Sequence, residues 1–210
     1  MLVLTAQLNN QKKFMYKRYG VRGVIKLTLS LIFTKLFFPQ ARLIRLPFDI
    51  RNKHRIKIGK AFTTGFGCRI EAQPVDDSND YCIEIGQNVQ INDYVHIASG
   101  QKVIIGDNVL IASKVYISDI NHGLYTGLNQ DSPLHPPVLR KLSTKPVTIG
   151  DNVWIGEGVC VMPGTFIGKG SIIGALSVVT KSIEPYSIAV GNPAKIIKKY
   201  NFDLQAWVAV

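Results

Sequence analysis

The residue in this chain best suited to acid–base chemistry is His122, in the segment "SDINHG". An imidazole titrates near neutral pH and can take a proton from a hydroxyl group. The other histidines compete less well: His135 lies among prolines in a rigid loop wall, His96 alternates with apolar residues on an expected strand, and His54 lies in a basic run. We therefore predict that His122 is a general base, with Asp119 three residues before it.

Aliphatic residues recur every six positions along most of the chain, which an α-helix or an ordinary strand would not require. They include Ile85, Ile91 and Ile97; Ile105, Ile111 and Ile117; and Ile149, Ile155, Val161, Ile167, Ile173 and Val179. This period is typical of hexapeptide repeats in a parallel β-helix. Each unit forms one side of a triangular coil with one aliphatic residue inward, and stacked coils bury the ladders. We predict an all-β solenoid over residues 51–190.

Two segments interrupt the repeat. Residues 74–81 form a short polar excursion, whereas 32 residues separate Ile117 from Ile149 where the repeat allows six. A long loop that leaves a regular solenoid is usually functional. We predict an active-site loop at residues 118–146. After the coil, residues 191–210 are predicted to form a tail with a short C-terminal helix.

The positive charge of the chain is concentrated at its N-terminus. The net charge is +11, and residues 1–60 contain 14 Lys or Arg and one acid, whereas residues 61–210 contain 11 and 13. Residues 1–50 are predicted to form a basic amphipathic helical extension, with Arg18, Arg22 and Lys26 on one face. The apolar run at 24–39 is too short to span a bilayer. Contact with an anionic membrane and packing on the domain or its neighbour both fit, whereas nucleic acid is not expected.

The three cysteines, Cys68, Cys82 and Cys160, are widely spaced and no two have CxxC spacing. We interpret them as reduced thiols that act as small buried apolar residues. Such thiols indicate a reducing compartment, and no secretory signal is evident at the start of the chain. A cytoplasmic location is therefore expected.

Several motifs resemble those of known enzymes. The segment 146–200, with "NVWIG", "VTK" and "GNPAK", resembles the hexapeptide-repeat O-acetyltransferases of the galactoside and maltose acetyltransferase superfamily. "FTTGFGCRIEA", "LIASKVYISDINHG" and "KRYGVRG" resemble more closely the bacterial O-acetyltransferases of lipopolysaccharide O-antigen and capsule biosynthesis. The resemblance covers nearly all of the chain. It implies a left-handed β-helix, a homotrimer, acetyl-coenzyme A between neighbouring coils, a sugar acceptor and no metal. The basic N-terminal helix is then expected to hold the trimer at the inner face of the bacterial cytoplasmic membrane, where lipid-linked sugars are built.

The resemblance also implies the roles of individual residues. The base is again His122, and Trp154 of "NVWIG" belongs to the active site. Asn92 matches an acceptor-sugar contact, and Asp119 is expected to bind the acceptor as well. Ile120 stands where relatives often have a histidine, so acceptor preference can differ. The expected coenzyme contacts are Gly156, Ala175, Thr180, Lys181, Pro193, Lys195 and Lys198.

Two other functions stay open at this point. A zinc-dependent β-helix hydratase of the carbonic-anhydrase type would need three or four His, Cys or carboxylate ligands, and only His96 and His122 form a coil-side pair. A non-catalytic scaffold would bind no coenzyme A. Trp154 also fits a platform that packs on the next subunit, and Lys181 and Lys195 also fit solvated charges. The acceptor sugar and its hydroxyl position are not determined by the sequence.

Overall fold

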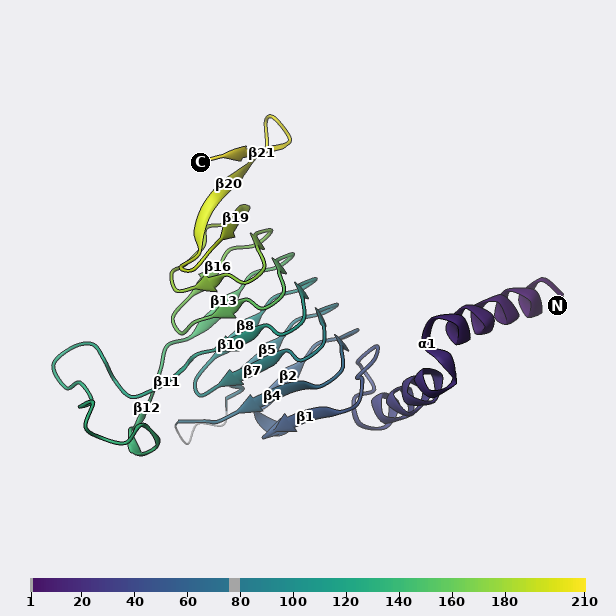
Figure 1. Cartoon of the computed structure of the whole chain (residues 1–210), viewed down its shortest axis with the longest axis horizontal. Helices are drawn as coiled ribbons and strands as arrows, with labels where there is room; N and C mark the ends of the chain where they lie inside the picture. The colour runs from purple at the N-terminus through teal and green to yellow at the C-terminus, as the bar shows by residue number, and fades with distance from the viewer. Residues whose placement is uncertain (1, 76–79) are drawn as a thin grey trace.

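The chain folds as a triangular prism of stacked coils, with a long helix at one end and a loop that leaves one edge (Figure 1). The computed structural model describes residues 2–75 and 80–210, with side chains from Lys17 onward. Successive short strands build three parallel sheets, which we call faces A, B and C. The prism is the predicted left-handed parallel β-helix.

The strands are distributed over the three faces in stacking order. Face A contains β3 (Thr63–Thr64), β6 (Gln90–Ile91), β9 (Leu110–Ile111), β14 (Trp154–Ile155), β17 (Ile172–Ile173) and β19 (Ser187–Val190). Face B contains β1 (Phe48–Arg51), β4 (Cys68–Ala72), β7 (His96–Ser99), β10 (Tyr116–Ser118), β15 (Cys160–Val161) and β18 (Val178–Val179). Face C contains β2 (Ile56–Ile58), β5 (Ile83–Ile85), β8 (Val103–Ile105), β13 (Val147–Ile149) and β16 (Phe166–Ile167). Two 3-10 turns, η1 (Lys53–Arg55) and η2 (Pro137–Leu139), complete the short elements before β2 and in the long loop.

The six-residue period forms the predicted inward ladders. On face B, Ile70, Ile97, Ile117, Val161 and Val179 lie in register, and all are fully buried. The structure adds a second inward residue to each unit: Val153 before Ile155 and Val159 before Val161 are buried as well. Each such side chain contributes about 1.5–3 kcal/mol on burial. The core is therefore denser than the single aliphatic residue per unit that the period predicts.

Asparagines turn the chain at the edge between faces C and A. Asn88, Asn108 and Asn152 have φ values of 55°, 56° and 57°. This left-handed region is disfavoured for most residues, but Asn tolerates it. The side chains of successive coils stack, and Asn88 Nδ2 donates to Asn108 Oδ1 at 2.9 Å. The repeated Asn of "GQNV" and "GDNV" therefore sets the same turn in each coil.

The N-terminal helix α1 (Leu2–Phe37) is interrupted at Gly20, which has φ 65° and ψ 174°. After the helix, Phe38, Ala41 and Ile44 are buried against the first coil. Residues before position 51 therefore already pack on the coil. Among the residues that the structure describes, no helix is both long and apolar enough to cross a membrane.

The prediction of a C-terminal helix is wrong. Residues 191–210 contain β20 (Lys195–Asn201) and β21 (Ala206–Ala209), an antiparallel hairpin added to β19 of face A. The open edge of β19 supplies backbone hydrogen-bond partners that no helix could use. Tyr200 and Trp207 are cross-strand neighbours with ring centroids 5.3 Å apart, and Ile196 packs on the core. These contacts override the local helical pattern of "AKIIKKY".

Candidate active site

His122 lies at the edge where face B turns into face C. β11 (Ile120–His122) pairs antiparallel with β12 (Leu142–Thr144), so the long loop leaves the coil as a two-stranded ribbon. His122 is the last residue of the first strand, and its side chain is exposed. Figure 1 shows the remainder of the loop reaching away from the prism beyond β11 and β12. The ribbon therefore presents the imidazole outside the coil surface.

The backbone at His122 is fixed by two loop residues that the sequence analysis missed. Tyr125 Oη donates to the His122 carbonyl, and Arg140 Nη1 donates to Tyr125 Oη at 2.8 Å. Arg140 Nε also donates to the carbonyl of His135 at 3.0 Å. Within the described part of the chain, the imidazole of His122 itself has no hydrogen-bond partner. The main chain is thus held while the ring stays available to a substrate.

Asp119, which is predicted to bind the acceptor, is engaged within the coil by hydrogen bonds. Its carboxylate is completely buried and accepts four hydrogen bonds from the previous coil. The donors are Ser99 Oγ at 2.9 Å and the backbone N–H groups of Gly100 at 2.7 Å, Gln101 at 2.9 Å and Lys102 at 2.6 Å. Asp119 therefore anchors the base of the loop, three residues before His122.

Asn92 lies at the opposite edge of face B from His122. It follows β6 of face A and precedes β7 of face B, whereas His122 follows β10 of face B. Its backbone N–H donates to the Ile111 carbonyl at 2.9 Å, and its side chain lines a cavity beside Arg45. A single chain therefore does not bring Asn92 and His122 together.

The predicted coenzyme residues are divided between the same two edges. Gly156, Ala175 and Pro193 lie on the edge of Asn92, where a Cβ on Gly156 would come within 2.6 Å of the Ala175 nitrogen. Thr180 and Lys181 follow β18 on the edge of His122 and are exposed. Lys195 and Lys198 lie on β20 and are exposed. Trp154, on the outer surface of face A, is 50 % exposed and has Leu110 and Ile172 as register neighbours.

Cys68, Cys82 and Cys160 form no disulfide bonds. Burial raises the pKa of the Cys68 thiol to about 11, so the thiolate is scarce at neutral pH. His96 is also occupied, because its Nε2 lies 2.8 Å from Glu71 Oε1. Within residues 2–75 and 80–210, no three His, Cys, Asp or Glu side chains gather closely enough to hold a metal ion.

Glu71 is the centre of an ionic cluster on face B, with Arg51 Nη1 at 3.0 Å and Arg69 Nε at 3.5 Å from its oxygens. Burial raises the pKa of this carboxyl, but the hydrogen bond with His96 and the charge of Arg69 outweigh burial and leave the pKa below its usual value. A lowered folded-state pKa stabilises the fold above the unfolded pKa, and this stabilisation is lost as pH falls through the folded pKa.

We expect Glu71→Gln to lower the free energy of unfolding by about 1–3 kcal/mol at neutral pH. The difference from wild type should shrink as pH falls through the lowered folded-state pKa of Glu71, because the wild-type carboxyl then becomes protonated as well. Urea unfolding across pH would measure this. Glu157→Gln, an exposed residue 3.6 Å from Lys114, is the matched control and should change little. A difference that does not vary with pH would contradict the assigned charge.

Residues 146–181 match the family model "Bacterial transferase hexapeptide (six repeats)". The chain is 46 % identical over 192 residues to an Escherichia coli (strain K12) protein named for lipopolysaccharide biosynthesis O-acetyl transfer, WbbJ, covering 91 % of this chain and 95 % of that protein. It is 40 % identical to the galactoside O-acetyltransferase of the same organism, covering 74 % and 72 %. A solved structure of AntD, an N-acyltransferase from Bacillus cereus, shares the fold, with a TM-score of 0.65, 24 % identity, and coverage of 83 % and 90 %.

These relatives are acetyltransferases, and they match most of this chain. The extent and identity of the match show that this chain belongs to the bacterial hexapeptide-repeat acetyltransferases. The resemblance inferred from the motifs is thereby confirmed.

Proposed function

We propose that this enzyme transfers an acetyl group from acetyl-coenzyme A to a sugar hydroxyl of a bacterial surface polysaccharide or its precursor. The observation that carries the proposal is the exposed, unpartnered imidazole of His122 on a main chain fixed by Tyr125 and Arg140. The lipopolysaccharide-related name of the 46 % identical relative supports the acceptor class.

In the proposed reaction His122 takes the proton of the acceptor hydroxyl. The sugar oxygen forms a bond to the acetyl carbonyl carbon, and the carbon–sulfur bond of the thioester breaks. The imidazolium then returns its proton to the leaving sulfur, so that coenzyme A is released as a thiol. No covalent enzyme intermediate is needed. Trp154 is proposed to border the reacting groups from face A.

The C-terminal cations fit a coenzyme with several phosphates. Lys181, Lys195 and Lys198 are exposed, and none forms an ion pair with a described residue. A lysine ammonium is a compact charge that binds phosphate well. Gly156 and Ala175 offer a flat edge without long side chains, beside which the pantetheine arm is proposed to lie. Thr180 and Pro193 complete the proposed site.

We also propose that the working unit is a homotrimer. Asn92 and His122 lie on opposite edges of face B, so two chains that meet edge to edge would complete one acceptor site. Sedimentation equilibrium should give three times the mass of one chain. A monomeric mass in an active preparation would overturn this arrangement.

The exposed face of α1 is proposed to contact an anionic membrane. Val21, Ile25, Leu29, Ile32 and Leu36 repeat every three or four residues and are between 53 % and 71 % exposed. They form one helix stripe, and the first acidic residue of the chain is Asp49. An apolar stripe on a basic helix binds anionic lipid surfaces.

We expect the triple variant Val21→Ser, Ile25→Ser, Ile32→Ser to bind phosphatidylglycerol vesicles at least about tenfold more weakly than wild type. Co-sedimentation would measure this binding. The matched control replaces three exposed apolar residues of the long loop, Leu128, Leu134 and Val138, by Ser. Equal binding by both variants would contradict the proposed contact between α1 and the membrane. Deleting residues 1–50 is a poorer test, because Phe38 and Ile44 cover the first coil.

The direct test of the proposed function is thiol release from acetyl-coenzyme A by the wild-type chain with a panel of bacterial oligosaccharides. Acceptor-dependent release is expected, and mass spectrometry of the product should show one added acetyl group. Release that requires zinc, or hydration of carbon dioxide without an acceptor, would favour the hydratase. Absence of coenzyme A binding by calorimetry would favour the scaffold.

A further inference from the structure

A continuous groove runs between α1 and the first coils, on the edge that carries Asn92. It consists of three adjoining hollows that share lining residues. Lys26, Leu46 and Phe66 line both the first hollow and the second, and Tyr19 and Arg45 line both the second and the third. The two outer hollows measure about 530 and 340 Å³, a size typical of small-molecule sites. The chemical character changes along the groove.

The first hollow is apolar. Its lining is Leu29, Leu46, Pro47 and Phe66, with Lys26 at its inner border. Leu29 also belongs to the exposed stripe of α1, so this end of the groove opens beside the proposed membrane contact. A hydrocarbon chain that enters beside Leu29 would meet the apolar lining of this hollow.

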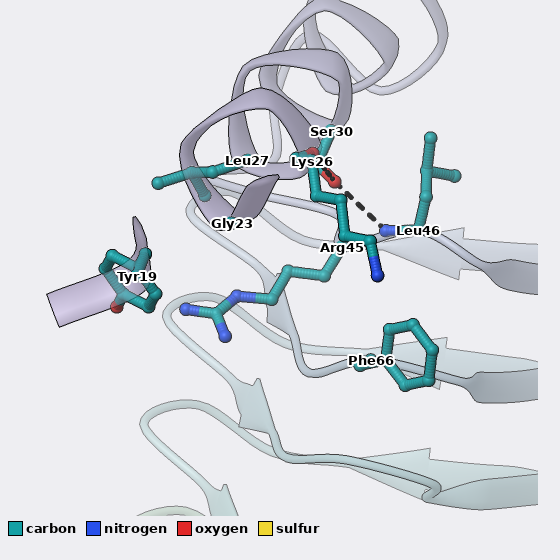
Figure 2. Close-up of a pocket in the computed structure, with 8 residues that line it drawn as sticks. All are labelled: Tyr19, Gly23, Lys26, Leu27, Ser30, Arg45, Leu46 and Phe66. Atoms are coloured by element: carbon teal, nitrogen blue, oxygen red, sulfur yellow. Dashed lines mark hydrogen bonds between the residues drawn. The ribbon is translucent and has the colours of Figure 1, made fainter. Parts of the chain in front are cut away.

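The centre of the groove is cationic. Figure 2 shows the Lys26 ammonium descending from α1 towards Phe66, and the Arg45 guanidinium reaching from the coil towards Tyr19. Arg18 lines the adjoining hollow, its Cζ 5.5 Å from the Tyr19 ring centroid. No described residue forms an ion pair with any of these three cations. Arg45 lines both the central and the polar hollow, so it lies between Lys26 on one side and Arg18 on the other.

The third hollow is polar and ends at Asn92. Thr63, Gln90 and Ser113 line it with backbone and hydroxyl groups suited to a sugar. Asp93 is the one acid among its lining residues, and its Oδ1 already accepts from the Phe66 backbone at 2.7 Å. The net charge of the groove therefore stays positive.

Two glycines of the "KRYGVRG" segment shape the cover of this groove. Gly20, at φ 65°, breaks α1 and directs Arg18 and Tyr19 towards the coil. A Cβ on Gly23 would lie 2.8 Å from Tyr19 Cβ, so only glycine allows this close approach. Neither glycine is needed for the coil itself, which favours a role in ligand binding.

We propose that this groove binds the acceptor as a sugar joined through a diphosphate to an isoprenoid lipid. The order of the groove matches the order of such a molecule: apolar chain, two phosphates, sugar. Arg18, Lys26 and Arg45 would hold the diphosphate, and Asn92 the sugar. This inference rests on the proposed function, because it names the acceptor of that reaction. Guanidinium groups bind phosphate oxygens in pairs of charge-assisted hydrogen bonds, which explains two arginines at the centre.

The test measures ligand binding to the full chain by calorimetry with coenzyme A present at saturation, so that phosphates do not occupy the coenzyme site. The probes are geranyl diphosphate, inorganic pyrophosphate and uridine diphosphate. We expect geranyl diphosphate to bind most tightly. Arg45→Gln and Arg18→Gln should each weaken both geranyl diphosphate and pyrophosphate by about tenfold or more. Phe66→Ser should weaken geranyl diphosphate and leave pyrophosphate within about twofold.

The matched control is Arg42→Gln, which removes an arginine that hydrogen-bonds Asn88 outside the groove. It should bind all three probes as wild type does. Equal losses in Arg45→Gln and Arg42→Gln would overturn the site. Tighter binding of uridine diphosphate than of geranyl diphosphate would overturn the proposal of a lipid-linked ligand and indicate a sugar nucleotide. If Arg18→Gln and Arg45→Gln weaken only the binding of phosphatidylglycerol vesicles, these cations contact the membrane and not a diphosphate.

The two proposals fail separately. If the wild-type chain binds geranyl diphosphate but releases no thiol with any acceptor, the proposed acetyl transfer is contradicted. The proposed diphosphate-binding groove is then still supported. Wild-type chain that acetylates free oligosaccharides without binding any diphosphate would contradict the groove alone. Thermal unfolding of each variant shows whether the coil is intact, and Arg18 lies on the exposed helix, away from the coil core.

Discussion

His122→Ala is expected to reduce acceptor-dependent acetyl transfer by a factor of about 10²–10⁴. The exposed imidazole has no hydrogen bond to lose, so its removal should leave the fold and the thermal unfolding temperature unchanged. The fall should lie mainly in kcat, since proton removal belongs to the chemical step. Thiol release with a fixed acceptor would measure it.

His135→Ala is the matched control, because His135 lies in the same loop and its recorded hydrogen bonds, to Ser132 and Arg140, use only its backbone. Its rate should stay within about twofold of wild type. Added imidazole should restore part of the His122→Ala rate if the missing group is a base. Equal rates for wild type and His122→Ala would exclude His122 from the reaction.

Asp119→Ala is expected to lower the free energy of unfolding by roughly 3–5 kcal/mol. The substitution leaves three backbone N–H groups of the previous coil without their acceptor and removes one of the two acceptors near the Ser99 hydroxyl, at a carboxylate that is completely buried. The base of the loop would also lose its anchor, so activity should fall together with stability. Urea unfolding and thiol release on the same preparation would measure both.

Asp107→Ala provides the comparison, since Asp107 is another carboxylate at a coil corner. Its Oδ1 accepts from the backbone N–H of Gln87 at 2.6 Å, in a more exposed position. We expect a loss of about 1 kcal/mol and unchanged activity. A loss for Asp119→Ala no larger than that for Asp107→Ala would show that the four hydrogen bonds do not anchor the loop.

The coil could be predicted from the sequence because its constraint is local and repeated. Each inward position such as Ile111 must be aliphatic, and six residues always return the chain to the next inward position. The C-terminal hairpin could not be predicted in this way. Lysines and isoleucines of "AKIIKKY" fit a helix locally, and the strand form depends on the free edge of β19, which only the completed coil provides.

The candidate site was predictable in part. His122 is recognisable because the repeat breaks beside it, and Trp154 because its motif is distinctive. The role of Asp119 was not recognisable, since its hydrogen-bond donors lie 17 to 20 residues earlier, one coil away. Arg140 escaped notice for the same reason: only the folded loop returns it to Tyr125.

Because the strands of face B are parallel and in register, the stacked coils are evenly spaced along the prism. β10, β15 and β18 are successive strands of one sheet, so the coil that ends near His122 and the coil that ends near Thr180 differ by two strand spacings, about 10 Å. One coil spans 18 residues, as from Ile149 to its register neighbour Ile167. Adding or removing one such coil would move the proposed phosphate-binding lysines by about 4.8 Å relative to the proposed base, with local surroundings preserved. The number of coils therefore sets the length of acyl carrier that the proposed site would fit.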